Sequence, residues 1–188
     1  MKRIFVLMGC LLMIQQAVTA QGKFFTKNGK ISFVSKGAIE TIEAKHKSTT
    51  CVLDSKTGDI QFAVLMKGFE FKKALMQEHF NENYVESSKY PRSEFKGQVT
   101  NNSDIDYTKD GTYKAKVKGK LTIHGETKEV ESDGTITVKS GNIEAASGFS
   151  ILLSDYKIAI PAMVKDNINN TVYITVNCPL EPLKNQNN

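Results

Sequence analysis

The sequence lacks the motifs of the large enzyme classes. It contains no Gly-x-Ser-x-Gly, no His-Glu-x-x-His and no glycine-rich phosphate loop, which carry a nucleophile, a metal site or a phosphate cradle. Its three histidines, at positions 46, 79 and 124, are expected on different faces of the fold, and no cysteine belongs to a Cys-x-x-Cys pair. We therefore expect no catalytic residues, no metal site and no cofactor.

Tryptophan is absent, and charge of one sign is not in large excess. Without an N-terminal leader that carries Lys2 and Arg3, the 25 basic residues become 23 against 20 acidic ones, a net charge of +3. No arginine-rich cluster or ladder of aromatic side chains accompanies this balance. The composition therefore argues against nucleic acid as a partner.

No apolar run is long enough to span a bilayer. The run from Ile4 to Ile14 is too short. It follows a basic start and precedes the small residues Val18-Thr19-Ala20. This pattern predicts a secretory signal peptide over residues 1–20, cleaved after Ala20, and a periplasmic or secreted mature protein. The segment from Leu7 to Cys10 loosely resembles a lipoprotein cleavage box, so lipidation of Cys10 stays an alternative.

Cysteine is scarce in the mature chain, which keeps Cys51 and Cys178. In an oxidising compartment the two could form one disulfide, but pairing depends on a geometry that the sequence does not give. Two separate thiols are the favoured expectation.

What the sequence has in abundance is alternation. Lysine occupies every second position from 114 to 120, and a strand turns successive side chains to opposite faces. The lysines therefore predict a solvated face, and the residues between them predict a buried one. Comparable strand patterns occur in eight segments: 31–37, 39–54, 59–71, 93–100, 112–123, 128–140, 142–154 and 171–178.

Turn-forming residues separate these segments at 54–59, 124–127, 132–134 and 140–142. One stretch differs, because apolar residues from Ala74 to Tyr84 recur at three- and four-residue spacings and predict an amphipathic helix of about two to three turns. The pattern as a whole predicts an all-β fold over residues 21–183, a barrel or sandwich with the helix covering one end, and a frayed polar tail at 184–188.

Three stretches resemble the YceI-like proteins. Residues 67–97 combine a phenylalanine-bearing strand, a short helix, Tyr90-Pro91 and Phe95-Lys96-Gly97. Residues 119–130, GKLTIHGETKEV, resemble the hairpin of that family, and residues 148–161 its penultimate strand and following loop. The resemblance implies an eight-stranded antiparallel lipocalin-like β-barrel. It also implies a long apolar tunnel for a polyisoprenoid or other lipid-like chain, in an exported protein.

Two departures from the family pattern bear on the ligand. Gln77 and Glu78 replace an Arg-Asp pair at the helix, and Leu153 stands where an arginine is usual. If those arginines hold an anionic head, a pyrophosphate-headed ligand is disfavoured here. A quinone, or a lipid with a neutral or carboxylate head, becomes comparably plausible.

Small inward side chains such as Ala115 and Gly119 are expected to leave room for a ligand. His46 should point inward, where it either anchors a ligand's polar head or satisfies a core hydroxyl. His79 is expected near the tunnel mouth and His124 in solvent. The candidate ligand-binding residues are Phe33, Ala44, His46, Phe62, Phe69, Phe71, Met76, His79, Phe80, Tyr84, Phe95, Tyr113, Ala115, Val117, Leu121, Ile123, Phe149 and Ile151.

We therefore expect an exported, non-enzymatic carrier of an amphiphilic small molecule or lipid such as a polyisoprenoid, a quinone or a fatty-acid-like molecule. Two rivals stay open: a solid-core structural or protein-interaction barrel, and a hydrolase or isomerase acting on a lipid. The sequence leaves a homodimer open as well.

Overall fold

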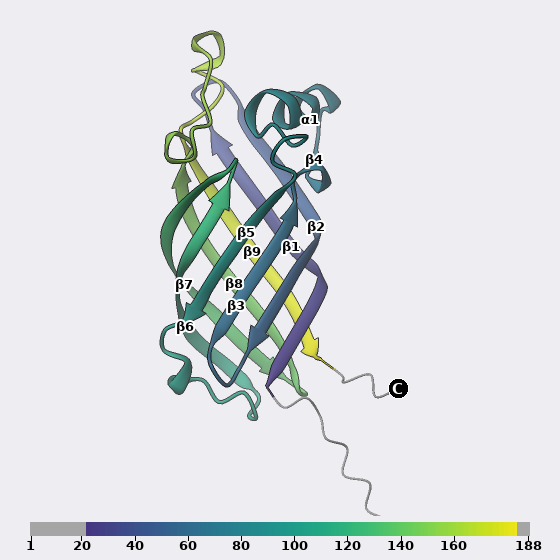
Figure 1. Cartoon of the computed structure of the whole chain (residues 1–188), viewed down its shortest axis with the longest axis vertical. Coiled ribbons are helices and arrows are strands. Elements are labelled where there is room, and N and C mark those ends of the chain that lie inside the picture. The colour runs from purple at the N-terminus through teal and green to yellow at the C-terminus, as the bar shows by residue number, and fades with distance from the viewer. Residues whose placement is uncertain (1–21, 184–188) are drawn as a thin grey trace, which may run out of the picture.

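The computed structural model of the chain describes residues 22–183, so the predicted signal peptide, Cys10 and the polar tail lie outside the described residues. A single antiparallel sheet closes on itself, because β1 pairs with both β9 and β2 (Figure 1). Its strands are β1 Lys23–Lys36, β2 Thr41–Asp54, β3 Asp59–Leu65, β4 Glu70–Phe71, β5 Arg92–Val99, β6 Gly111–Ile123, β7 Glu126–Lys139, β8 Asn142–Leu152 and β9 Thr171–Pro182. Eight of them form the wall in the order β1-β9-β8-β7-β6-β5-β3-β2, and β4 is additional. The eight-stranded antiparallel barrel is thereby confirmed.

Strand β6 shows why the alternating pattern closes a barrel. Its lysines at 114, 116, 118 and 120 are all exposed, while Ala115, Leu121 and Ile123 are buried. One face of the strand therefore meets water and the other faces the interior, as the period of two requires.

The turns were predicted correctly at three of four places. Gly58, Gly125 and Gly141 have positive φ angles of 78°, 77° and 79°, in the turns β2–β3, β6–β7 and β7–β8. The turn predicted at 132–134 is wrong, because these residues lie inside β7. Gly134 pairs with Ala115 on one side and Ser147 on the other, so the backbone there continues two ladders instead of reversing.

A short helical segment covers one end of the barrel. Strand β3 breaks at the 3-10 turn η1 Met66–Gly68, and after β4 the chain enters α1 Ala74–His79 and the π-helical turn η2 Phe80–Tyr84. This matches the predicted helix over 74–84. The loop from 157 to 170, which contains η5 Ala162–Val164, lies at the same end, the helix end (Figure 1). The short turns η3 Asn102–Asp104 and η4 Leu153–Tyr156 follow β5 and β8.

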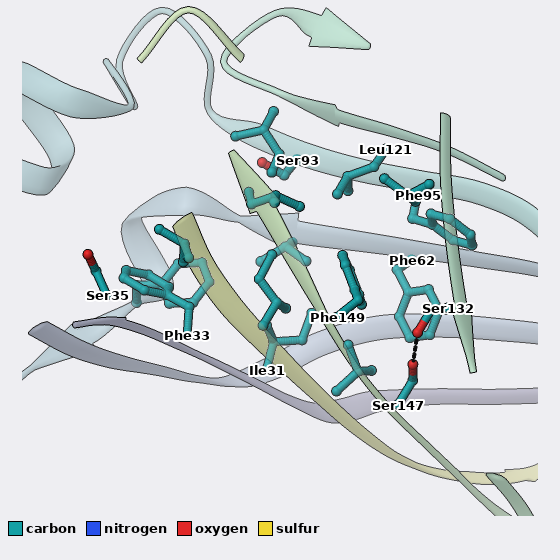
Figure 2. Close-up of a pocket in the computed structure, with 18 of the residues that line it drawn as sticks. Ile31, Phe33, Ser35, Phe62, Ser93, Phe95, Leu121, Ser132, Ser147 and Phe149 are labelled. Atoms are coloured by element: carbon teal, nitrogen blue, oxygen red, sulfur yellow. Dashed lines mark hydrogen bonds between the residues drawn. The ribbon is translucent and has the colours of Figure 1, made fainter. Parts of the chain in front are cut away.

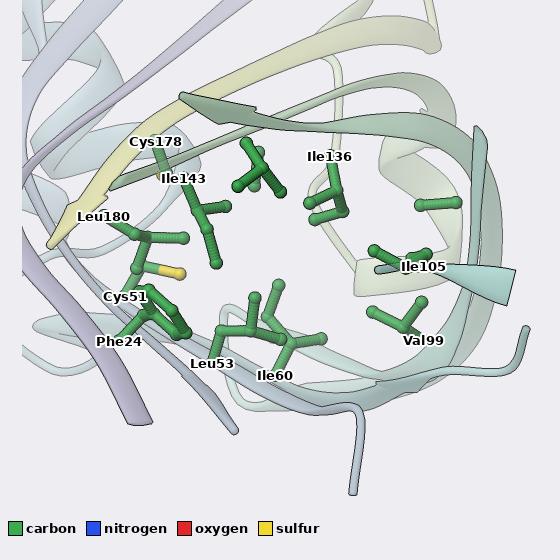
Figure 3. Close-up of a cluster of buried hydrophobic side chains, with 13 residues drawn as sticks. Phe24, Cys51, Leu53, Ile60, Val99, Ile105, Ile136, Ile143, Cys178 and Leu180 are labelled. Carbon is green, nitrogen blue, oxygen red and sulfur yellow. The ribbon is translucent and has the colours of Figure 1, made fainter. Parts of the chain in front are cut away.

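The opposite end, the closed end, is filled by side chains (Figure 3). A compact cluster there draws on most strands and on Ile105 of the loop after η3, and includes Phe24, Cys51, Leu53, Ile60, Val99, Ile136, Ile143, Cys178 and Leu180. The two cysteines are fully buried free thiols. The hydrogen bond that the Cys51 thiol donates to Cys178, together with burial, raises the pKa of Cys51, so the pair acts as core and not as a nucleophile.

Candidate ligand cavity

The barrel is hollow from the helical cover down to the closed-end core, whose Ile60, Val99 and Ile136 form the floor of the hollow. A cavity of about 330 Å³ runs along the axis between the closed-end core and the helical cover. This volume is at the lower end of the range found for small-molecule sites. Figure 2 shows inward side chains from opposite walls facing this space, among them Ile31, Phe62, Leu121 and Phe149. Because these residues alternate with outward ones along each strand, the barrel geometry itself lines the cavity with apolar groups.

Four phenylalanines gather where α1 and η2 meet the strands. Phe33 lies 5.3 Å from Phe69 and 5.6 Å from Phe80, between ring centroids, and Phe71 lies 5.0 Å from Phe80. Such tilted and offset pairs are favourable beyond their buried area. The helical cover is thus held to the barrel by rings that also line the cavity.

Few polar groups reach the cavity, and several of them are paired within the protein. The Ser132 and Ser147 hydroxyls lie 2.5 Å apart on β7 and β8, and Ser93 donates to the Met66 sulfur at 2.9 Å. At the helix end, the Lys73 ammonium donates to Glu40 at 2.7 Å and holds the pKa of that carboxyl below its usual value.

The charge of the cavity wall is unusual for a site that would hold an anion. Within residues 22–183, no lysine or arginine lines the cavity. Of the two acidic residues along it, Glu40 accepts a hydrogen bond from Lys73, and the Glu94 carboxylate lies 3.4 Å from the Lys96 ammonium, two residues further along β5. Leu153, which stands where the family pattern has an arginine, also lines it. The wall therefore offers an anionic head group no lysine or arginine.

All but three of the candidate residues named from the sequence line this cavity; their role toward a ligand stays a prediction. The fifteen that do are Phe33, Phe62, Phe69, Phe71, Met76, His79, Phe80, Tyr84, Phe95, Ala115, Val117, Leu121, Ile123, Phe149 and Ile151. Burial raises the pKa of Tyr84, so its hydroxyl stays neutral at the helix end.

Ala44, His46 and Tyr113 were placed on the cavity wall from their strand parity, and the structure places them elsewhere. Ala44 is buried opposite Phe71 in the β2–β4 pairing. The Tyr113 hydroxyl donates to the Lys109 carbonyl at 3.0 Å, toward the closed end.

His46 is separated from the cavity by the Phe69 ring, which lies 5.3 Å away between centroids. Its Nδ1 accepts hydrogen bonds from the Ser48 N–H at 3.3 Å and the Thr49 hydroxyl at 2.9 Å. Burial lowers the pKa of the imidazole. Of the two roles proposed for His46, this geometry fits the satisfaction of a core hydroxyl.

His124 was expected in solvent, and this is wrong. Its Nε2 lies 2.7 Å from the Glu86 carboxylate and its Nδ1 lies 3.0 Å from the Tyr156 carbonyl oxygen. His124, in the β6–β7 turn, thus connects the segment after η2 with the chain after β8. The alternation of side chains along a strand does not reveal such a contact.

The room expected at Gly119 is occupied. Gly119 pairs with Gly97 on β5, and the Phe95 ring lies over both of them: a Cβ on Gly119 would come within 2.7 Å of the ring. The two glycines therefore make space for an aromatic side chain of the protein, and not for a ligand.

Several cavity residues were missed by the sequence reasoning. Ile42, Val64, Val130, Val172, Ile174 and Val176 lie on strands whose alternation was recognised, so their inward parity could have placed them on the wall. Ile158, Val164 and Ile168 come from the loop between β8 and β9. A loop has no periodicity that marks which side chains turn inward.

The described residues hold no cluster of three or more histidine, cysteine or acidic side chains that could bind a metal ion. Across residues 22–183, none of the helices has the length and apolarity that a bilayer span requires.

The closed barrel and its apolar axial cavity define a barrel of the lipocalin-like kind. The chain belongs to the YceI-like family, because its sequence matches the YceI-like domain over residues 12–180. A comparison with curated proteins returned no match.

Solved structures share the fold at low sequence identity. A polyisoprenoid-binding domain from Saccharophagus degradans, described as implicated in plant cell wall breakdown, superposes with a TM-score of 0.75 at 13% identity. The match covers 86% of this chain and 99% of that one. Burkholderia cenocepacia BcnA gives 0.66 at 18% identity, with 81% and 95% covered, and a Campylobacter jejuni YceI protein gives 0.51 at 19%, with 72% and 83% covered. At these identities the likeness concerns the fold.

Proposed function

We propose that this protein is an exported carrier that holds one lipid with a long apolar chain and an uncharged head, such as a quinone or a polyisoprenoid, inside its barrel. The observation that carries the proposal is the cavity wall, which is aromatic and aliphatic and, among the described residues, contains no lysine or arginine. Family membership and the polyisoprenoid-binding neighbour support a lipid as the class of ligand. Export rests on the N-terminal sequence pattern alone.

Binding would be driven by the removal of an apolar chain from water, which is worth about 25 cal/mol per Å² of buried surface. The serine hydroxyls on the wall already bond within the protein, so a head group that needs strong ionic partners gains little from them. A carboxylate or pyrophosphate would find no lysine or arginine on this wall, and burying such a charge without a partner carries an electrostatic cost.

The first test is native mass spectrometry of the protein purified from its own host, followed by organic extraction of whatever it releases. A stoichiometric quinone, isoprenoid or other uncharged lipid would support the proposal. An apo mass, together with no uptake from a lipid extract of that host, would point to the rival structural or interaction barrel. A bound anionic lipid would overturn the inference about the head group.

A matched pair of variants tests the site. Ala115 faces the cavity from β6 and is almost completely buried, whereas Lys116 faces solvent on the same strand. Ala115→Phe should fill part of the cavity, abolish uptake and destabilise the fold by at most about 1–3 kcal/mol through overpacking. Lys116→Phe adds the same ring outside the barrel and should leave uptake unchanged. Equal uptake by both variants would contradict the placement of the ligand.

A further inference from the structure

The floor of the cavity, formed by Ile60, Val99 and Ile136, rests on a packed core. The three side chains line the cavity and also belong to the closed-end core, where they are 3%, 1% and 2% exposed. Figure 3 shows them pointing inward from three different strands. Leu53 and Leu180, which are buried in the same core, do not line the cavity. The cavity therefore ends at the floor.

The floor lies at one level on neighbouring strands. On β7 the boundary falls between Ile136, which lines the cavity, and Val138, which does not. On β8 it falls between Ala145, which lines the cavity, and Ile143, which does not. Ile136 pairs with Ala145 across the two strands, and Val138 pairs with Ile143. The boundary is therefore a layer of the barrel interior, and the residues just beneath it form the next layer.

The loop at 100–110 closes the barrel below these layers. The Tyr107 ring stacks on Phe24 with 6.4 Å between centroids, and its hydroxyl donates to the Asn102 Oδ1 at 2.8 Å. Asn102 in turn donates to the Ser55 carbonyl at 2.9 Å, which joins the loop to the β2–β3 turn. An apolar chain that enters at the helix end therefore meets packed side chains at the other end.

The two ends of the cavity differ in polarity. The floor is aliphatic, whereas Glu40, His79, Tyr84 and Asn167 line the cavity at the helix end. An amphiphilic lipid therefore fits with the tip of its apolar chain on the floor and its head toward the helix end. The opposite orientation places the head among aliphatic side chains that offer it no hydrogen bond.

The space above the floor limits the length of that chain. On β7 the cavity is lined from Val130 to Ile136, which corresponds to roughly 15 Å along the barrel axis, at about 3.3 Å per residue and a strand tilt of about 40°. The volume of about 330 Å³ holds about eleven non-hydrogen atoms, at the roughly 30 Å³ that one water molecule occupies in the liquid. An isoprene unit has five carbon atoms. The volume therefore corresponds to two or three isoprene units, which the depth also accommodates.

We propose that the floor selects the length of the apolar chain, and that the protein prefers chains of two or three isoprene units to longer ones. The inference rests on the proposed carrier function and narrows its class of lipid. A longer chain leaves apolar surface in water at the helix end, which a bilayer would bury, so its transfer into the barrel is less favourable. Val99 and Ile136 are the residues that determine the specificity, because shortening their side chains extends the cavity toward the closed end.

The test truncates the floor and, as a control, the layer beneath it. Val99→Ala with Ile136→Ala removes five carbon atoms from the floor, as many as one isoprene unit contains. Val138→Ala with Ile143→Ala also removes five, from side chains that are each 2% exposed and do not line the cavity. Both pairs weaken the core, but the second leaves a separate void and does not lengthen the cavity. Ala145→Leu makes the opposite change, because it adds three carbon atoms beside the floor.

Each protein is mixed with phosphatidylcholine vesicles that carry equal amounts of isoprenoid alcohols of two, three, four and eight units. Native mass spectrometry of the separated protein then gives the lengths retained. The unaltered protein should hold the two- and three-unit alcohols in at least about tenfold excess over the eight-unit alcohol, because the longest chain cannot be buried. The floor variant should shift by one unit toward longer chains and Ala145→Leu toward shorter ones. The control should keep the original profile, and cooperative urea unfolding shows that each variant is folded.

Equal shifts in the floor variant and the control overturn the selection of length and leave the carrier function standing. So does an unaltered protein that retains the eight-unit alcohol as well as the three-unit one. If truncation of the floor unfolds the barrel, Ala145→Leu decides, because an unchanged profile in that variant contradicts the proposal. Retention of none of the four alcohols by the folded, unaltered protein contradicts both the selection of length and the carriage of isoprenoids.

Discussion

Ser132 on β7 and Ser147 on β8 share a hydrogen bond of 2.5 Å at the point where the two strands part. The β7–β8 ladder runs only from Lys139–Asn142 to Gly134–Ser147. Beyond it β7 pairs with β6 alone and β8 with β9 alone. A surface hollow lined by residues 128–131 and 149–152 lies where the strands have separated. The barrel thus has a side seam in addition to its helix end.

The side seam offers a second route for a ligand, and a reversible disulfide at its inner end can limit how far it opens. Because the two hydroxyls are in contact, Ser132→Cys with Ser147→Cys should form a bridge on mild oxidation. If lipid enters through the helix end, oxidised and reduced forms should take up a fluorescent isoprenoid at the same rate. The reduced form of the same protein is the control. Uptake that stops on oxidation and returns with dithiothreitol would identify the seam as the route.

Leu153 and Leu152 give a matched pair for the head-group inference. Leu153 lines the cavity, whereas Leu152 is exposed on the outer face. Leu153→Arg places a cation in apolar surroundings, and we expect at least about tenfold weaker binding of an uncharged isoprenoid, because burying an unpaired charge is costly. Binding of a fatty acid should fall less, since its carboxylate can pair with the new guanidinium.

Leu152→Arg should alter neither affinity. Competition between an isoprenoid alcohol and a fatty acid, followed by fluorescence displacement, measures both ligands in one experiment. If the Leu153 variant keeps its preference for the uncharged lipid, the head group does not lie near η4.

How far the sequence predicts this molecule is best seen on β6 and in the loop after η4. The alternation of lysine and small or apolar residues assigned the inward face of β6 correctly, because parity is a local property of a strand. It could not show that the space at Gly119 is taken by Phe95 from the neighbouring strand, which depends on register. His46 and Ile158 show two other limits. The Phe69 ring lies between His46 and the cavity, which the sequence does not predict. Ile158 lines the cavity from a loop, where no periodic pattern marks the inward side chains.

Gly119 and Gly111 test the close approach of β5 and β6. A Cβ on Gly119 would lie 2.5 Å from the Gly97 Cα and 2.5 Å from the Lys96 carbonyl oxygen, so the backbones would have to separate. Gly119→Ala should lower the free energy of unfolding by about 1–3 kcal/mol, the usual cost of overpacking. A Cβ on Gly111, on the same strand, meets nothing nearer than 3.4 Å. Gly111→Ala should stay within about 0.5 kcal/mol. Urea unfolding of both variants checks this. Equal stabilities would mean that the backbones of β5 and β6 can separate at Gly119 at little cost in free energy.

His46 should make the stability of the barrel depend on pH. Burial lowers its pKa below the ordinary value of 6.5, so in weak acid the unfolded chain binds a proton that the folded chain does not. The stabilising contribution is therefore complete above about pH 6.5 and is lost as the pH falls toward the lowered folded pKa, by at most about 1.4 kcal/mol per pH unit for one proton. His46→Asn cannot take up this proton and retains an acceptor for the Ser48 N–H. Its free energy of unfolding, followed by urea titration between about pH 7 and pH 5, should fall less steeply than that of the unaltered protein. Parallel slopes in the two proteins would show that the imidazole titrates normally in the fold and that its burial behind Phe69 does not control its charge.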